Sequence, residues 1–286
     1  MNVYSIETGL FKLDGGAMFG VVPKTIWNKL NPADENNLCT WTMRCLLIED
    51  GDRLILIDNG IGNKQSEKFF SHYYLHGDNS LDKSLAKHGF SKDDITDVFL
   101  THLHFDHCGG SIIREGEKLI PSFKNAKYWS NQEHWNWAVY PNDREKASFL
   151  KENILPIQES GQLQFIEVVN NEDDKLSEAS FTQNISVRFV NGHTEKMMLP
   201  QIKYQDKTIV FMADLLPSTA HIPLPYVMAY DMQPLKTLSE KKLFLNEAFD
   251  NNYVLFFEHD AQHECCTLHQ TEKGIRENEI FKLSEI

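Results

Sequence analysis

A histidine-rich stretch in the first half of the chain has the residue types of a metal site. Three histidines and one aspartate fall within six positions, as His102, His104, Asp106 and His107, directly after the apolar run Asp97–Thr101. Imidazole and carboxylate are ligands that zinc, iron and manganese accept. His102 and His104 are two residues apart and lie on the same side of an extended segment, whereas Asp106 and His107 follow a turn. The spacing indicates two metal ions, and it disfavours the alternative of coincidental histidines in a polar loop.

Three further candidate ligands stand at the ends of later apolar runs: His193, Asp214 and His259. In layered α/β folds, active sites lie at the carboxyl ends of strands, so we expect these side chains to join the first group. Taken singly, each has an ordinary structural role as its alternative, such as a helix N-cap for Asp214 or a surface loop position for His259. The four clusters together indicate one site.

The elements that must position these residues alternate between strands and helices. An Asp-Gly turn at Asp50–Asp52 between two apolar runs predicts a β-hairpin. The expected strands are Cys45–Glu49, Arg53–Asp58, Asp97–Thr101, Gln164–Val169, Ile185–Val190, Met198–Tyr204, Thr208–Ala213 and Tyr253–Phe257. The expected helices are Ser80–His88, Asn131–Val139, Asp143–Leu155 and Leu235–Phe249. Two sheet-forming halves, with Gln164–Val169 in the second, predict an α/β sandwich with helices on its outer faces. Since no repeat or linker marks a boundary, we expect a single domain over residues 1–286.

The amino-acid composition limits the classes of molecule that this protein is expected to bind and the compartment in which it is expected to act. The chain of 286 residues has 41 acidic and 28 basic side chains, and its net charge of −13 disfavours nucleic acid. No run approaches the ~20 apolar residues of a membrane span. The five cysteines include an adjacent pair and form a poor disulfide framework, which indicates a reducing compartment. With no secretory signal visible, we expect a cytoplasmic protein that acts on a small molecule.

The ordered set H-x-H-x-D-H, Gly-His, Asp and His resembles the metallo-β-lactamase superfamily of di-metal hydrolases, over residues 58–259. The resemblance implies an αββα four-layer sandwich, the metallo-β-lactamase fold, with the site at one edge. It implies a first metal held by His102, His104 and His193. It implies a second metal held by Asp106, His107 and His259, with Asp214 bridging the two.

Asp58 matches an aspartate that lies beneath the site in this superfamily. The resemblance implies that it orients a ligand without touching a metal. The alternative is a turn residue at the end of a hairpin.

Two other segments, Leu13–Lys24 and Ala220–Asp231, resemble the quorum-quenching lactonase branch of the superfamily. That branch includes acyl-homoserine lactonases and methyl-parathion-hydrolase-like phosphotriesterases. One departure lies at Thr194–Met198, where many members have a Thr-Pro-Gly-His-like stretch. This departure weighs against transferring the substrate preference of glyoxalase-type relatives.

The same two segments supply candidate pocket residues. Met18 and Phe19 are too apolar for an exposed glycine-rich loop, so they either line a substrate pocket or pack as core. His221 and Tyr230 could polarise a carbonyl or hold a leaving group, and ordinary loop packing is the alternative for each. The apolar N-terminal segment suits a homodimer interface as well as a pocket wall, which leaves the oligomeric state open.

The predicted cofactors are two divalent metal ions, zinc first, with iron or manganese as alternatives. Such a pair lowers the pKa of a shared water to about 7 and so provides hydroxide at neutral pH. The expected reaction opens a lactone of the acyl-homoserine type or cleaves a related ester, with Asp106 or Asp214 carrying the proton. Cys108 is not needed as a nucleophile and is expected to be a small packing residue.

Two alternatives to lactone hydrolysis remain. One is phosphotriester hydrolysis at the same site. The other is a non-hydrolytic iron oxidoreductase of the same fold. His104 disfavours the latter, because the di-iron branch usually has glutamate at that position.

Overall fold

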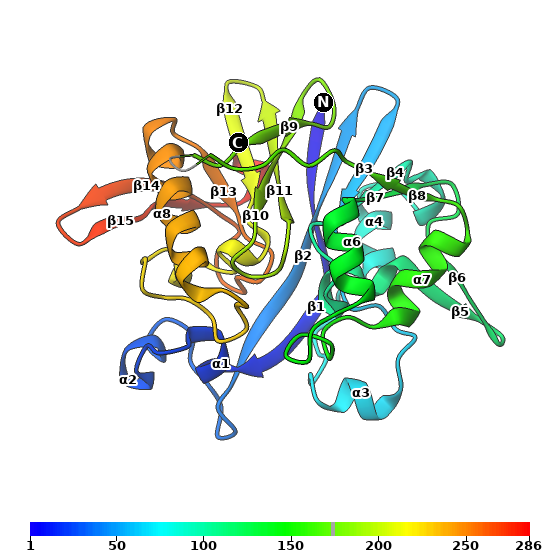
Figure 1. The fold of residues 1–286 in the computed structure, drawn as a ribbon, viewed down its shortest axis with the longest axis horizontal. Helices are drawn as coiled ribbons and strands as arrows, with labels where there is room; N and C mark the ends of the chain where they lie inside the picture. Colours follow the sequence, from blue (N-terminus) through cyan, green and yellow to red (C-terminus); the bar gives the residue numbers. More distant parts are fainter. Residues whose placement is uncertain (173–174) are drawn as a thin grey trace. The chain divides into compact units, whose positions relative to one another are not determined.

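The computed structural model describes residues 1–172 and 175–286, which form two compact units (Figure 1). Unit 1 contains Met1–Leu10 and Met43–Val168, and unit 2 contains Phe11–Thr42 and Val169–Ile286. The boundary falls inside two long strands, β1 (Asn2–Asp14) and β2 (Leu38–Asp50). Among the described residues, we find no helix with the length and apolar character needed to cross a membrane.

The sheet of unit 1 has the strand order β1-β2-β3-β4-β7-β8. Its later strands are β3 (Arg53–Ile57), β4 (Asp97–Phe99), β7 (Lys127–Ser130) and β8 (Leu163–Phe165). From β3 onward all neighbours are parallel, whereas β2 and β3 form the predicted antiparallel hairpin with Asp50 opposite Arg53. Gly51 in its turn has φ 63°, a conformation that glycine adopts without strain.

The helices of unit 1 cover an apolar core. They are α3 (Glu67–Ser71), α4 (Leu81–Lys87), α5 (Phe105–Cys108), α6 (Gln132–Val139) and α7 (Lys151–Glu159), with 3-10 turns η1 (Lys92–Asp94) and η2 (Gly109–Ser111) and a small hairpin β5 (Ile112–Glu115)–β6 (Lys118–Pro121). Leu56 and Val98 from the sheet share one cluster with Leu85, Trp135 and Ile154 from α4, α6 and α7.

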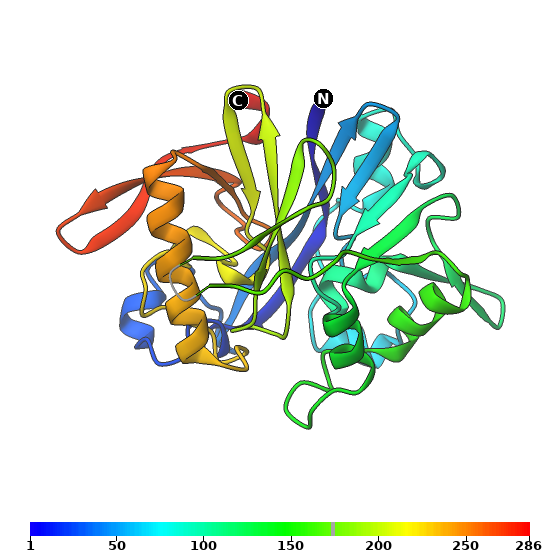
Figure 2. The same ribbon diagram turned by 45° about the horizontal axis from the view of Figure 1, so that its top comes forward.

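The sheet of unit 2 has the order β15-β14-β13-β12-β11-β10-β9. Its strands are β9 (Glu178–Ser180), β10 (Ile185–Val190), β11 (Met197–Tyr204), β12 (Lys207–Phe211), β13 (Val254–Phe256), β14 (Cys265–Thr271) and β15 (Gly274–Phe281). All neighbouring pairs are antiparallel except β12 and β13. The long helix α8 (Pro234–Asp250) lies in the chain segment that connects β12 to β13. It packs against β14 and β15 (Figure 2).

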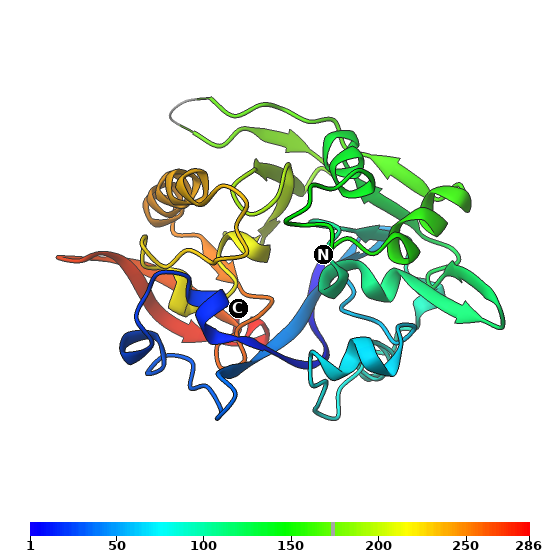
Figure 3. The same cartoon turned by 60° about the horizontal axis from the view of Figure 1, so that its bottom comes forward.

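Short elements complete unit 2: α1 (Gly15–Phe19), α2 (Lys24–Trp27) and the 3-10 turns η3 (Ala213–Leu215), η4 (Thr219–His221) and η5 (Leu283–Glu285). Figure 3 shows α1 beside the yellow segment that contains η4, and the Phe19 and His221 rings stack there. Asp14 caps α1 by accepting a hydrogen bond from Ala17 N.

Two of the sequence predictions are wrong. The helix expected over Asp143–Leu155 begins only at Lys151, because the Asn142 side chain accepts from Arg144 N and Glu145 N and holds that stretch in a turn. The strand expected over Gln164–Val169 is the short β8, which pairs with β7 in unit 1 rather than joining the second sheet. The remaining expected strands and helices are present with bounds shifted by up to two residues, except that β2 begins at Leu38, seven residues before the expected start at Cys45.

Candidate metal centre

The histidine-rich loop of unit 1 leaves β4 and turns at once into α5, so that its polar side chains point inward. His102, His104, Asp106 and His107 are all buried. His102 Nε2 lies 3.1 Å from His104 Nδ1, and His107 Nε2 lies 3.7 Å from Asp106 Oδ2. Cys108 is fully buried in the core, and burial raises the pKa of its thiol to about 12, as suits a packing residue.

Asp58 lies beneath this loop, just after β3. Its φ of 56° turns the chain out of the strand, and its carboxylate accepts from Thr101 N at 2.8 Å and Thr101 Oγ1 at 2.6 Å. The carboxylate oxygen Oδ2 of Asp58, which accepts from Thr101 Oγ1, also lies 3.1 Å from His107 Nδ1. These are the contacts that an orienting role requires, since they fix both the start of the loop and one imidazole.

Two buried residues that the sequence analysis missed also support this loop. Glu145 Oε1 lies 3.0 Å from His104 Nε2, and Trp137 Nε1 donates to the other carboxylate oxygen. His134 Nε2 accepts from Leu103 N at 2.9 Å. Glu145 lies inside the segment that was expected to be helical, so no pattern in the sequence pointed to it.

In unit 2, the carboxylate of Asp214 lies between two histidines. Its Oδ2 is 3.1 Å from His193 Nε2, and its Oδ1 is 3.1 Å from His259 Nε2. Asp214 follows β12 inside η3, and all three side chains are buried. One carboxylate oxygen therefore faces each imidazole, an arrangement that suits a bridging ligand.

The outer nitrogen of each of these two rings is also held. His193 Nδ1 lies 2.8 Å from the buried Asp231 carboxylate, and His259 Nδ1 lies 2.7 Å from Thr42 O. Asp231 was missed as a site residue, although it ends the Ala220–Asp231 segment that resembles the lactonase branch.

Helix α8 fixes the turn that carries His193. Glu240 accepts from Asn191 N and from Gly192 N, both at 2.9 Å. A Cβ on Gly192 would lie 2.2 Å from Thr237 Oγ1, so only glycine fits this close approach. Burial raises the pKa of Glu240 above its ordinary value.

The donor set fits metal ions. In four of the histidines, one ring nitrogen faces a carboxylate or carbonyl oxygen, the arrangement that fixes the tautomer of a metal-ligating imidazole. The other nitrogen of each ring lies 3.1–3.7 Å from another candidate ligand atom. Bonds of 2.0–2.1 Å at tetrahedral angles place two ligand atoms about 3.3 Å apart, which agrees with these separations.

Three of the four candidate pocket residues, Met18, Phe19 and His221, are buried in unit 2. The buried Phe19 ring stacks on His221 with centroids 4.6 Å apart and an interplanar angle of 9°. His221 Nδ1 lies 2.8 Å from Ser218 Oγ, and its Nε2 lies 2.9 Å from Met18 O. Burial lowers the pKa of His221 to about 3, so this ring is neutral at pH 7. Tyr230 is exposed, and substrate contact by these four residues stays a prediction.

Comparison with known proteins decides the family. The model of the metallo-beta-lactamase superfamily matches residues 44–259. The chain belongs to the metallo-β-lactamase superfamily. Curated N-acyl homoserine lactonases of Bacillus thuringiensis are 26% identical over 165 residues, which are 54% of this chain and 56% of the relative. The lactonase of Bacillus cereus is 26% identical over 44% of this chain and 48% of its own length. The chain thus spans about half the length of the curated relatives it matches.

Solved structures agree on the fold. A probable metal-dependent hydrolase from Staphylococcus aureus superposes with a TM-score of 0.87 and 28% identity, over 98% of this chain and 96% of that one. The dizinc quorum-quenching lactonase AidC gives a TM-score of 0.77 at 20% identity, over 98% and 94% of the two chains. These likenesses confirm the expected α/β sandwich fold of the superfamily.

Proposed function

We propose that this chain is a lactone hydrolase that uses two divalent metal ions, zinc in the first place, and that its substrates are of the N-acyl-homoserine lactone type. The observation that carries the proposal is the Asp214 carboxylate, which faces His193 and His259 at 3.1 Å each. The lactonase relatives and the branch-like segments Leu13–Lys24 and Ala220–Asp231 support the substrate class.

The ligand sets in this proposal are those that the family resemblance implies. His102, His104 and His193 would hold one ion, and Asp106, His107 and His259 the other, with Asp214 shared. Ions bound in this way supply Lewis acidity toward the lactone carbonyl and a water of lowered pKa.

The protein's own part is to fix tautomers and to move a proton. Asp58, Asp231 and Glu145 hold ring nitrogens that face away from the proposed ions, so that each imidazole presents its other nitrogen. Asp214 or Asp106 would take the proton from the attacking water and pass it to the leaving alkoxide. Adding one water across the lactone bond gives a single product, an N-acyl-homoserine. This product carries both the new carboxylate and the hydroxyl of the leaving alkoxide.

The test combines metal analysis with activity on one sample. We expect about two zinc ions per chain, with N-hexanoyl-homoserine lactone hydrolysis that is lost on chelation and restored by zinc. Asp214→Asn should lose both, whereas Asp78→Asn, at an exposed position, should change neither. Faster cleavage of a phosphotriester than of any lactone would favour phosphotriester hydrolysis instead. Two irons without hydrolysis, or no metal after reconstitution, would overturn the proposal.

A further inference from the structure

Helix α8 contains a buried lysine, Lys241, that the proposed mechanism does not use. Its residue is 1% exposed. Its ammonium nitrogen Nζ lies 2.7–3.4 Å from four backbone carbonyl oxygens, those of His221, Pro223, Leu224 and Tyr226. All four belong to residues 221–226 of unit 2, the carbonyl loop. One side chain therefore binds this whole loop to the helix.

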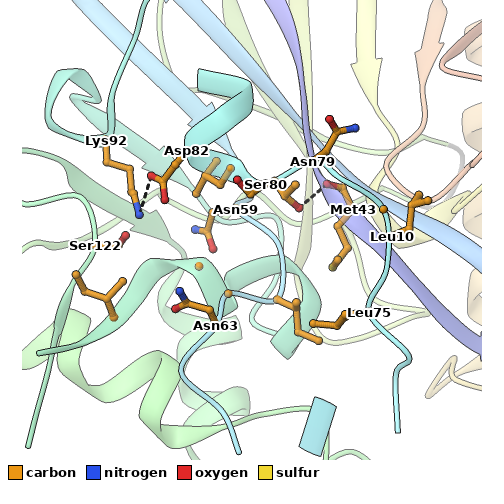
Figure 4. A pocket seen from close by; sticks show the side chains of 18 of the residues that line it. Leu10, Met43, Asn59, Asn63, Leu75, Asn79, Ser80, Asp82, Lys92 and Ser122 are labelled. Atoms are coloured by element: carbon orange, nitrogen blue, oxygen red, sulfur yellow. Dashed lines mark hydrogen bonds and ion pairs between the residues drawn. The ribbon is translucent and has the colours of Figure 1, made fainter. Parts of the chain in front are cut away.

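Burial of this ammonium costs free energy. It lowers the pKa of Lys241 to about 7, and the negative charge of Asp231 acts in the opposite direction. Within the described residues, Lys241 forms no ion pair. By contrast, Lys92 at the pocket of unit 1 in Figure 4 pairs with Asp82 at 2.9 Å. An apolar side chain of similar size would avoid the cost of desolvating a charge. The carbonyl contacts offset this cost, which indicates that the position of the loop matters.

The preceding residue of α8, Glu240, binds a second backbone segment with the opposite polarity. Its carboxylate accepts from the N–H groups of Asn191 and Gly192, both at 2.9 Å. Two consecutive residues of one helix thus hold two segments, the turn that precedes His193 and the carbonyl loop. The positions of both segments are therefore set by the same helix.

These two segments lead to the contact between His193 and Asp231. His193 Nδ1 lies 2.8 Å from Asp231 Oδ1, and Met232 N donates to His193 O at 3.1 Å. Asp231 follows the carbonyl loop after only residues 227–230. A displacement of the loop would therefore move the Asp231 carboxylate relative to the imidazole.

We propose that Lys241 is a positioning residue of the candidate metal centre. Its ammonium fixes the carbonyl loop and thereby keeps the Asp231 carboxylate against His193 Nδ1. Lys241 acts only through these groups and touches neither ligand nor substrate. Its effect on lactone hydrolysis rests on the proposed function, whereas its effect on the contact between Asp231 and His193 does not.

Two variants separate the charge of Lys241 from its volume. Lys241→Ala leaves a space that matches propylammonium, whose carbon chain and nitrogen correspond to the atoms removed beyond Cβ. Lys241→Met fills most of this space but has no hydrogen-bond donor. The neutral 1-propanol tests for plain cavity filling, and Lys242→Ala, at the exposed neighbouring position, is the control variant. All measurements are made below the pKa of Lys241, where its side chain is charged.

The first readout is the Nδ1 proton of His193, a downfield NMR signal that Asp231→Ala should remove. We expect this signal to move upfield or broaden in both Lys241 variants, because the Asp231 carboxylate is no longer held in place. Zinc affinity should fall about tenfold, measured by competition with a chromophoric chelator. The kcat/KM for N-hexanoyl-homoserine lactone should fall by a similar factor. Propylammonium should restore all three in Lys241→Ala and none in Lys241→Met.

Wild-type values in Lys241→Met, or no recovery of Lys241→Ala with propylammonium, would overturn the proposal. Equal recovery with 1-propanol would show that only the volume matters. Faster amide exchange at Tyr226 with an unchanged His193 signal and zinc affinity would show a purely structural role, which also contradicts the proposal. A wild-type protein that binds zinc but cleaves no lactone would refute the proposed function alone, since the first two measurements involve no substrate.

Discussion

The Asp231 carboxylate lies 2.8 Å from Nδ1 of His193 and is placed to accept a hydrogen bond from it. In the tautomer that this contact favours, Nε2, which lies 3.1 Å from Asp214 Oδ2, is the nitrogen that would bind a metal. In Asp231→Asn, the amide can present its NH2 group to Nδ1 and favour the tautomer in which Nε2 is protonated. We expect zinc affinity to fall about 10- to 100-fold, measured by competition with a chromophoric chelator. Asp250→Asn, at the exposed end of α8, is the control, and equal affinities in the two variants would refute the role.

His221 makes a second residue-scale prediction, on pH. Its folded pKa of about 3 lies below the ordinary value of 6.5, so between these values the unfolded chain binds a proton that the folded chain does not. Its contribution to stability is therefore complete above pH 6.5 and is lost as pH falls toward 3. In His221→Gln, the slope of the unfolding free energy against pH should decrease by at most about 1.4 kcal/mol per pH unit in this window.

Urea unfolding at a series of pH values measures this slope. The exposed His72 provides the control variant His72→Gln, which should keep the wild-type slope. An unchanged slope in His221→Gln would mean that the ring already carries a proton in the folded state.

Residue types and spacing alone predicted the seven candidate ligands, because packing rarely accounts for imidazole and carboxylate at successive strand ends, whereas Asp58 came from the family resemblance. They did not identify Asp231 or Glu145, which contact histidines 38 and 41 positions away in sequence. A single carboxylate in a loop carries no sequence signal until the fold brings it to its partner. The same holds for His221, whose stacking on Phe19 joins residues that the chain separates widely.

At the scale of elements, α8 packs against β14 and β15 and also holds the turn that precedes His193. The Glu240 carboxylate binds two backbone N–H groups of the turn that precedes His193. Glu240→Ala leaves both donors buried without this acceptor, so we expect the free energy of unfolding to fall by about 1–3 kcal/mol. The Gly192 amide should also lose protection in hydrogen exchange. Lys242→Ala, an exposed neighbour on the same helix, should change neither, and unchanged exchange at Gly192 in Glu240→Ala would contradict the role.

Elements with a local signal were predictable. The Asp-Gly turn fixed the β2–β3 hairpin, and Ser80 and Asn131 cap α4 and α6 as short polar residues before an apolar periodic run. The turn over Asp143–Leu150 was not predictable in this way, since the Asn142 side chain accepts hydrogen bonds from Arg144 N and Glu145 N and overrides an otherwise helical composition. The hairpin β5–β6 was not predicted, because its aliphatic residues form the adjacent pairs Ile112–Ile113 and Leu119–Ile120 and do not alternate with polar ones.

At the scale of the whole molecule, the ordered ligand motif predicted the superfamily and its fold, because that order of ligands is tied to one succession of strand ends. Composition could not place the boundary between the two units, since it runs through β1 and β2 and no linker marks it. The chain nevertheless carries one property that belongs to no single element, its net charge of −13.

This charge should select among substrates through its long-range field. A neutral lactone does not interact with it to first order, whereas an anionic ester is repelled before it reaches the site. The Debye length falls from about 30 Å at 0.01 M salt to about 8 Å at 0.15 M, so added salt screens the repulsion. We expect kcat/KM for an N-acyl-homoserine lactone to change less than about twofold over this range. For a carboxylated aryl ester it should rise several-fold, and stopped-flow or steady-state rates at matched pH measure both. A fall in kcat/KM for the anionic ester with added salt would instead show that cations near the site govern its approach.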